Sequence, residues 1–190
     1  MLKWFTLLSL SILSLAAQSE MRAFYVERTE VYSDYASIYI LRLANQIVPP
    51  DKSSTKKDVD CLLRQAKESG IFSDVHARMV QTAKPDMIEL FVTATPDSKL
   101  KNIVISEFAL VGFPAVSKAR FREALDKRGV RAGDSLLRYS LNELMEKITK
   151  SLEEASQNPD LELPWISIRP AGSGKVKFIV SPSYPGCGIA

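Results

Sequence analysis

The chain of 190 residues has one histidine and two cysteines, which leaves few side chains for metal binding or nucleophilic catalysis. His76 lies in a segment expected to form a strand, with no cysteine at metal-ligand spacing, so a zinc site or a Ser-His-Asp triad would depend on this residue alone. The acidic residues fall mostly on expected helix faces, and no pair of them is placed for acid–base chemistry. We therefore expect a protein that is not an enzyme, with no cofactor, no metal and no small-molecule substrate.

A phosphate-binding loop and a nucleic-acid-binding surface are also missing. Gly172-Ser173-Gly174-Lys175 looks like the end of a P-loop, but Arg169 stands where the first glycine belongs and Val176 replaces the hydroxyl residue. The two glycines suit a hairpin turn instead. The net charge of +3 is too small to indicate nucleic-acid binding, which needs a concentrated basic stripe. We expect no nucleic-acid partner.

The one long hydrophobic run, Trp4 to Leu15, is shorter than the roughly 20 residues that a membrane-spanning helix needs. Lys3 precedes it, and Ala17 and Ser19 follow with the small side chains that signal peptidase accepts. The pattern predicts a signal peptide at 1–19, cleaved after Ala17 or Ser19, with a retained anchor or a buried core segment as the alternatives. No cysteine follows the run, so a lipoprotein anchor is not indicated. We expect an exported protein that is soluble after cleavage.

Export would place Cys61 and Cys187 in an oxidising compartment, where disulfides persist. At about 100° per residue, Cys61 points away from the apolar face of the helix expected around it. That apolar face consists of Val59, Leu62, Leu63 and Ala66. An exposed thiol there could pair with Cys187 and join the tail to the first domain. Two unpaired thiols and an intermolecular pair remain the alternatives, because the sequence does not give the separation of the two residues.

The rest of the chain reads as two units of one plan: strand, helix, helix, strand, strand. In residues 22–96 we expect strands and helices at Ala23–Val31, Tyr35–Ile47, Thr55–Gly70, Val75–Gln81 and Met87–Thr95. Within the helix expected at Tyr35–Ile47, the segment Ile38–Leu43 is also a plausible strand. In residues 99–181 we expect them at Ile103–Leu110, Ser117–Gly129, Ser140–Asn158, Trp165–Arg169 and Lys175–Val180. The polar break from Pro96 to Lys99 is the expected domain boundary, and residues 182–190 read as an irregular tail. The predicted fold is α+β, two tandem small β-α-α-β-β domains, each a three-stranded sheet with two helices packed on one face.

Two glycine-containing segments resemble a known family. The run from Gly70 to Val75 resembles a recurrent signature of polypeptide-transport-associated (POTRA) domains: a helix, a glycine, an aromatic residue and, three positions later, a valine. In the second unit, Gly112 follows the first strand, and the run from Arg128 to Leu136 is similar to the helix–loop–helix joint of POTRA domains in outer-membrane β-barrel assembly factors. The residues that carry these motifs are Gly70, Phe72, Val75, Gly112, Gly129 and Gly133. Two motifs in register with a repeated element order strengthen the resemblance.

The resemblance implies a non-catalytic periplasmic module that binds envelope or outer-membrane proteins by adding a strand to a sheet edge, in outer-membrane protein assembly or secretion. In POTRA domains this edge is commonly the second strand, here represented by Val75, Ala77 and Met79 in one unit and by Trp165, Ser167 and Arg169 in the other. The chain departs from the assembly factors because only a few residues follow Val180, so we expect no barrel and an adaptor or scaffold role. It also has Pro164-Trp165 where those domains often have Gly-Tyr. A self-associating structural envelope protein, or a small-ligand carrier or enzyme on an unrelated α+β fold, remains the alternative.

One basic cluster has two interpretations. Its members are Lys118, Arg120, Arg122, Lys127, Arg128 and Arg131. They could meet an acidic partner, or anionic headgroups in a peripheral membrane-surface contact. Glu123 and Asp126 interrupt the cluster, so a solvated helix face is the favoured interpretation.

Overall fold

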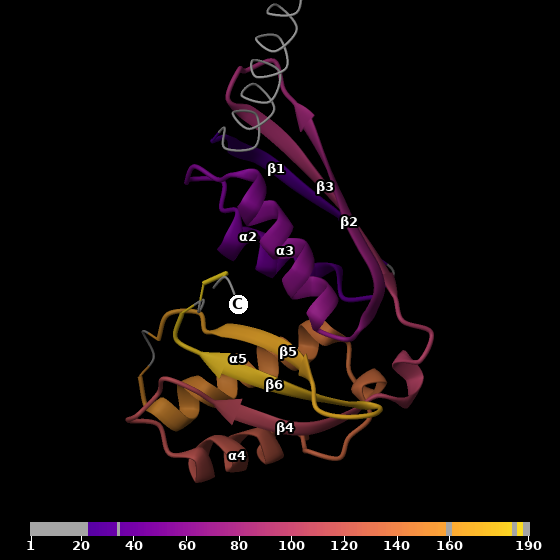
Figure 1. Ribbon diagram of the computed structural model, residues 1–190. Coiled ribbons are helices and arrows are strands. Elements are labelled where there is room, and N and C mark those ends of the chain that lie inside the picture. The colour runs from indigo at the N-terminus through magenta and orange to yellow at the C-terminus, as the bar shows by residue number, and fades with distance from the viewer. Residues whose placement is uncertain (1–22, 34, 159–160, 184–185, 188–190) are drawn as a thin grey trace, which may run out of the picture.

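The computed structural model describes residues 23–33, 35–158, 161–183 and 186–187. The predicted signal peptide, residues 1–19, lies outside the described residues, as does part of the predicted tail. The described chain is an α+β protein with two three-stranded sheets (Figure 1). None of its described helices is both long enough and apolar enough to span a membrane.

Unit 1 contains β1 (Tyr25–Tyr32), α2 (Ser37–Ile47), α3 (Lys56–Glu68), β2 (Phe72–Gln81) and β3 (Met87–Pro96). The strand order is β1-β3-β2, with β3 parallel to β1 and antiparallel to β2. The central strand alternates strictly, since its buried side chains are Ile88, Leu90, Val92 and Ala94. This period of two puts one face of the sheet under the two helices.

Unit 2 contains η1 (Leu100–Asn102), β4 (Val104–Leu110), α4 (Lys118–Lys127), η2 (Leu136–Arg138), α5 (Leu141–Ser156), β5 (Trp165–Pro170) and β6 (Lys175–Ser181). Its strand order, β4-β6-β5, has β6 in the centre, parallel to β4 and antiparallel to β5. Unit 2 therefore repeats the topology of unit 1. The predicted β-α-α-β-β order is confirmed in both units.

The helix ends follow from local side chains. Thr55 and Asp58 form a capping box at α3, in which the Thr55 N–H donates to Asp58 Oδ2 at 2.7 Å. Ser117 caps α4 by accepting a hydrogen bond from the Arg120 N–H. Gly70 follows α3 with a φ of +74°, a left-handed conformation that glycine adopts without strain. Thr55 and Ser117 thus fix where α3 and α4 begin, and Gly70 lets the chain turn from α3 into β2.

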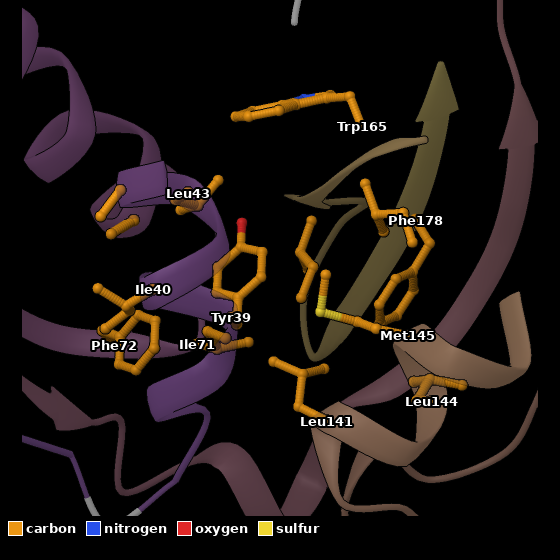
Figure 2. Packing of buried hydrophobic residues seen from close by; sticks show 14 of the residues in the cluster. Tyr39, Ile40, Leu43, Ile71, Phe72, Leu141, Leu144, Met145, Trp165 and Phe178 are labelled. Carbon is orange, nitrogen blue, oxygen red and sulfur yellow. The ribbon is translucent and has the colours of Figure 1, made fainter. Parts of the chain in front are cut away.

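One continuous hydrophobic core joins the two units. Figure 2 shows Tyr39 and Leu43 of α2 facing the residues of unit 2, with Leu141 and Met145 of α5 opposite and Trp165 of β5 above. The predicted boundary from Pro96 to Lys99 therefore lies between two sheets that share one hydrophobic core. Each unit buries part of its apolar surface only against the other unit. The domain limits 22–96 and 99–181 stay a prediction.

Tyr39 is the main polar contact inside this shared core. Its side chain is 1% exposed, and its hydroxyl oxygen accepts a hydrogen bond from the backbone of Ile168 in β5. Burial raises the pKa of Tyr39 to about 12, although this hydrogen bond and the nearby Arg169 act in the opposite direction. The phenol is therefore neutral at the contact of α2 and α3 with β5 and α5, which we call the joint between the units.

We expect Tyr39→Phe to lower the free energy of unfolding by about 1–3 kcal/mol, because the Ile168 amide stays buried without an acceptor. The pH dependence also changes. The folded pKa of Tyr39 lies above the ordinary value of 10.0, so its contribution is complete below pH 10 and is lost as the pH rises toward 12. Urea titrations at pH 8 and at higher pH measure both effects. Tyr25→Phe is the matched control, since Tyr25 is 44% exposed, and an equal loss in this variant would contradict the role of Tyr39.

Gly70 gives a second test of the joint. A Cβ added to Gly70 would lie 3.1 Å from Cγ of Pro170 in β5, whereas a Cβ at Gly129 would meet nothing within 4 Å. Both glycines have φ near +70°, so an alanine at either site costs about 1–2 kcal/mol in backbone strain. We expect Gly70→Ala to destabilise the protein more than Gly129→Ala in urea unfolding. Equal losses would mean that the contact with Pro170 adds no cost to that of the backbone conformation.

Candidate functional site: the edges of the two sheets

The four edge strands are β1, β2, β4 and β5. An edge strand presents N–H and C=O groups that another extended chain can pair with, so the surroundings of each edge decide whether it can bind a partner. The edge of β1 is partly closed at its start, because Phe24 exchanges two backbone hydrogen bonds of 2.8 Å with Ser54. The remaining three edges differ strongly.

The edge of β5 is covered by unit 1. Trp165 is 1% exposed and Ser167 is 7% exposed. The Ala171 N–H donates to the Lys175 C=O at 2.8 Å, so these two residues form a hydrogen-bonded pair. Hydrogen-bonded pairs recur at every second residue of the antiparallel register, which turns the backbone groups of Trp165, Ser167 and Arg169 toward β6. Ile166 and Ile168 turn their backbone groups outward, and the N–H of Ile168 donates to the Tyr39 hydroxyl. Trp165, Ser167 and Arg169 therefore turn their backbone groups toward β6 and not toward an open edge, and their role in partner binding stays a prediction.

The side chains of β5 serve the joint between the units instead. Arg169 forms an ion pair with Glu68 at 2.5 Å and a hydrogen bond with Gln65 at 2.6 Å, both on α3. The sequence did not indicate this role, because Ser167 and Arg169 alternate with Ile166 and Ile168. Such an alternation is typical of a strand that is buried on one face only.

The edge of β2 is open along the described residues. The Thr82 N–H donates to the Met87 C=O at 3.0 Å, and alternation from this pair turns the backbone groups of Val75, Ala77 and Met79 away from β3. Among the described strands only β3 pairs with β2. The structure thus places these three sequence-predicted residues together as a row of unpaired backbone donors and acceptors.

The exposure of the outward-paired residues of β2 increases along the strand. Val75 is buried under the helices, Ala77 is half-buried, and Met79 is 40% exposed. Beside Met79 lies a pocket of about 270 Å³ whose lining includes Phe24 and Ile88. A strand added to β2 would find here a place for an apolar side chain.

The other POTRA-like motif residues are structural. Phe72 is buried in the core next to Val75, and Gly70 occupies the turn before it. Gly112 has a φ of +77°, and a Cβ there would lie 2.9 Å from Cδ of Pro182. Gly129 and Gly133 also have positive φ, in the segment between α4 and α5. These residues shape the two units and contribute no group to the open edges.

The histidine of the chain lies on β2. His76 is exposed, and its Nδ1 lies 3.1 Å from Oδ2 of Asp74. Within the part of the chain that the structure describes, no group of three His, Cys, Asp or Glu side chains could hold a metal ion. The edges can provide backbone hydrogen bonds and apolar contacts.

Cys61 is 2% exposed, so the expectation that its thiol is exposed is wrong. The apolar face of α3 covers its own sheet as predicted, but the neighbouring face, with Cys61 and Gln65, is covered by the contact with unit 2. The structure pairs Cys61 with Cys187 as a disulfide, with Cα atoms 5.9 Å apart, across a sequence separation of 126 residues. The tail is thereby tied to α3 of unit 1.

No protein-family model matches the chain, and no curated protein matches it. The solved structures that match include POTRA3-5 of BamA from Haemophilus influenzae, at 9% identity and a TM-score of 0.37, covering 85% of this chain and 61% of that one. POTRA1-2 of Omp85 from Anabaena matches at 17% identity and a TM-score of 0.34, covering 87% and 99%. CdiB from Escherichia coli matches at 14% identity and a TM-score of 0.29, covering 90% and 29%. The chain is similar to these structures only at low identity and low TM-score, so the proposal below is based on its own edges.

We predict that the disulfide forms in the exported protein. Denatured protein should react with no maleimide-polyethylene glycol before reduction and with two equivalents after it, because both cysteines are paired within one chain. Cys187→Ser should lower the free energy of unfolding by about 2–5 kcal/mol, since the loop that the bond closes is long. Labelling of two thiols without reductant, or a dimer band on a non-reducing gel, would contradict an intramolecular pair.

Proposed function

We propose that this protein is a non-catalytic periplasmic binding module, which recruits an extended segment of an envelope or outer-membrane protein to the free edge of β2. The observation that carries the proposal is the outward row of backbone groups at Val75, Ala77 and Met79. Backbone pairing along this row would give affinity for any extended segment. The pocket beside Met79 would select for an apolar side chain at one position of that segment.

The joint between the units supports an adaptor role. Tyr39 and Arg169 connect α2 and α3 to β5, and the Cys61–Cys187 disulfide adds a covalent link. A tandem held in one arrangement presents the edge of β2 at a fixed position relative to unit 2. A role in outer-membrane protein assembly or secretion agrees with the POTRA-like motifs and with the predicted signal peptide.

A proline at Ala77 tests strand addition directly. The Ala77 N–H points outward, so Ala77→Pro removes one donor from the free edge without breaking a bond between β2 and β3. We expect this variant to keep its circular dichroism spectrum and to lose most partner binding. The matched control is Ala77→Val, which changes the side chain and keeps the N–H.

Binding is measured by photocrosslinking in cells from position 79, with adducts identified by mass spectrometry. Position 137, which is exposed on η2, reports background contacts. Adducts to an outer-membrane assembly or secretion protein that disappear in Ala77→Pro and persist in Ala77→Val are the expected result. Adducts that survive in both variants would contradict strand addition, and adducts only to a second copy would favour the self-associating structural protein.

A further inference from the structure

A groove of about 540 Å³ lies between the edge of β4 and α4, a part of the molecule that the predicted binding residues do not include. In Figure 1, β4 and α4 lie on the side of unit 2 away from unit 1, so the joint does not cover them. Its apolar lining comes from both elements: Phe108, Leu110, Phe121 and Leu125. The ring of Phe108 stacks on the ring of Phe178 in β6, with centroids 5.5 Å apart.

The edge of β4 is open along this groove. The Val111 N–H donates to the Val180 C=O at 2.9 Å, and alternation in the parallel pair turns the backbone groups of Phe108 and Leu110 away from β6. The other end of β4 is closed, because the Ile105 C=O accepts a bond from Gly133 at 2.7 Å and its N–H donates to Asp134 at 2.9 Å. The groove therefore offers a short row of free backbone donors and acceptors with an apolar wall.

Two basic side chains of α4 line the groove, Lys118 and Arg122. Neither of them has an ion-pair partner among the described residues. The acidic residues that interrupt the basic cluster are occupied, since Glu123 pairs with Lys127 at 3.3 Å and Asp126 with Arg131 at 3.4 Å.

One acidic residue, Glu107, lines the groove without a described ion-pair partner. The groove is thus lined by one unpaired negative charge, that of Glu107, and by two unpaired positive charges, those of Lys118 and Arg122, so positive charge is in excess. Anionic groups of a bound segment would be attracted to the α4 side of the groove.

We propose that this groove is a second strand-addition site, which takes an extended acidic polypeptide segment with apolar side chains at alternate positions. Free backbone groups at Phe108 and Leu110 select an extended chain, and the apolar wall selects alternate apolar side chains. The unpaired charges of Lys118 and Arg122 select acidic residues between them. A membrane surface would use the two cations but neither the backbone edge nor the concave wall. The site is separate from β2 and does not depend on the function proposed for that edge.

The probe is a fluorescein-labelled peptide, Glu-Val-Glu-Val-Glu-Val-Glu, with the lysine-for-glutamate peptide as its matched control. Binding to the exported chain is followed by fluorescence anisotropy and by amide chemical shifts and hydrogen exchange in NMR. We expect the acidic peptide to shift and protect the amides of Phe108 and Leu110. The double reversal Lys118→Glu and Arg122→Glu should weaken its binding about tenfold through like-charge repulsion. Arg120→Glu, on the same helix outside the groove lining, should leave binding unchanged.

Ala77→Pro separates the two sites, because it removes a donor from β2 and should leave the peptide at β4 unaffected. Four results would overturn the proposal: shifts confined to Val75–Met79, equal affinity for the lysine peptide, no binding of either peptide at about 1 mM, or perturbation only by phosphatidylglycerol vesicles. Failure at β4 with normal crosslinking from position 79 would refute this site alone.

Discussion

The burial of β5 against unit 1 is the contact on which the rest of the arrangement depends. β5 is an edge strand by hydrogen bonding, yet Trp165 to Ile168 are all buried, because α5 lies on one face and α2 and α3 approach from the other side. Small units of this size have little core of their own, so sharing one core reduces the apolar surface left in water. The outward N–H of Ile168 is buried by this contact and needs an acceptor. The Tyr39 hydroxyl oxygen accepts its hydrogen bond.

This contact makes the equivalent edges of two units with the same topology differ in accessibility. In unit 1 the edge of the second strand, β2, is free, whereas the equivalent edge in unit 2 is used by the joint. The first strands of the two units, β4 and β1, are both closed at their start, β4 by Gly133 and Asp134 and β1 by Ser54. Identical topology therefore does not imply that the same edges are free, because the neighbouring unit decides which edge remains accessible.

Local signals in the sequence were sufficient for the elements and their order. The expected ranges Met87–Thr95 and Thr55–Gly70 agree with β3 and α3. Ile88, Leu90 and Val92 alternate along β3, Thr55 with Asp58 begins α3, and Gly70 follows its end. The sequence could not place Cys61 or Ser167, because a helix or strand residue on the face away from its own core is covered only when another unit packs there. Free edges are likewise a tertiary property, since the register fixes which backbone groups point outward but not what lies beside them.

The joint also determines what two open edges can do together. If the units were hinged, segments bound at β2 and β4 would move independently, and occupying one edge would not position the other. The shared core, the Arg169–Glu68 pair and the Cys61–Cys187 bond all connect unit 1 to unit 2. If segments bind at both edges as proposed, a segment at one edge lies at a set distance and angle from a segment at the other. The contact between the units would then fix the placement of both segments before either of them binds.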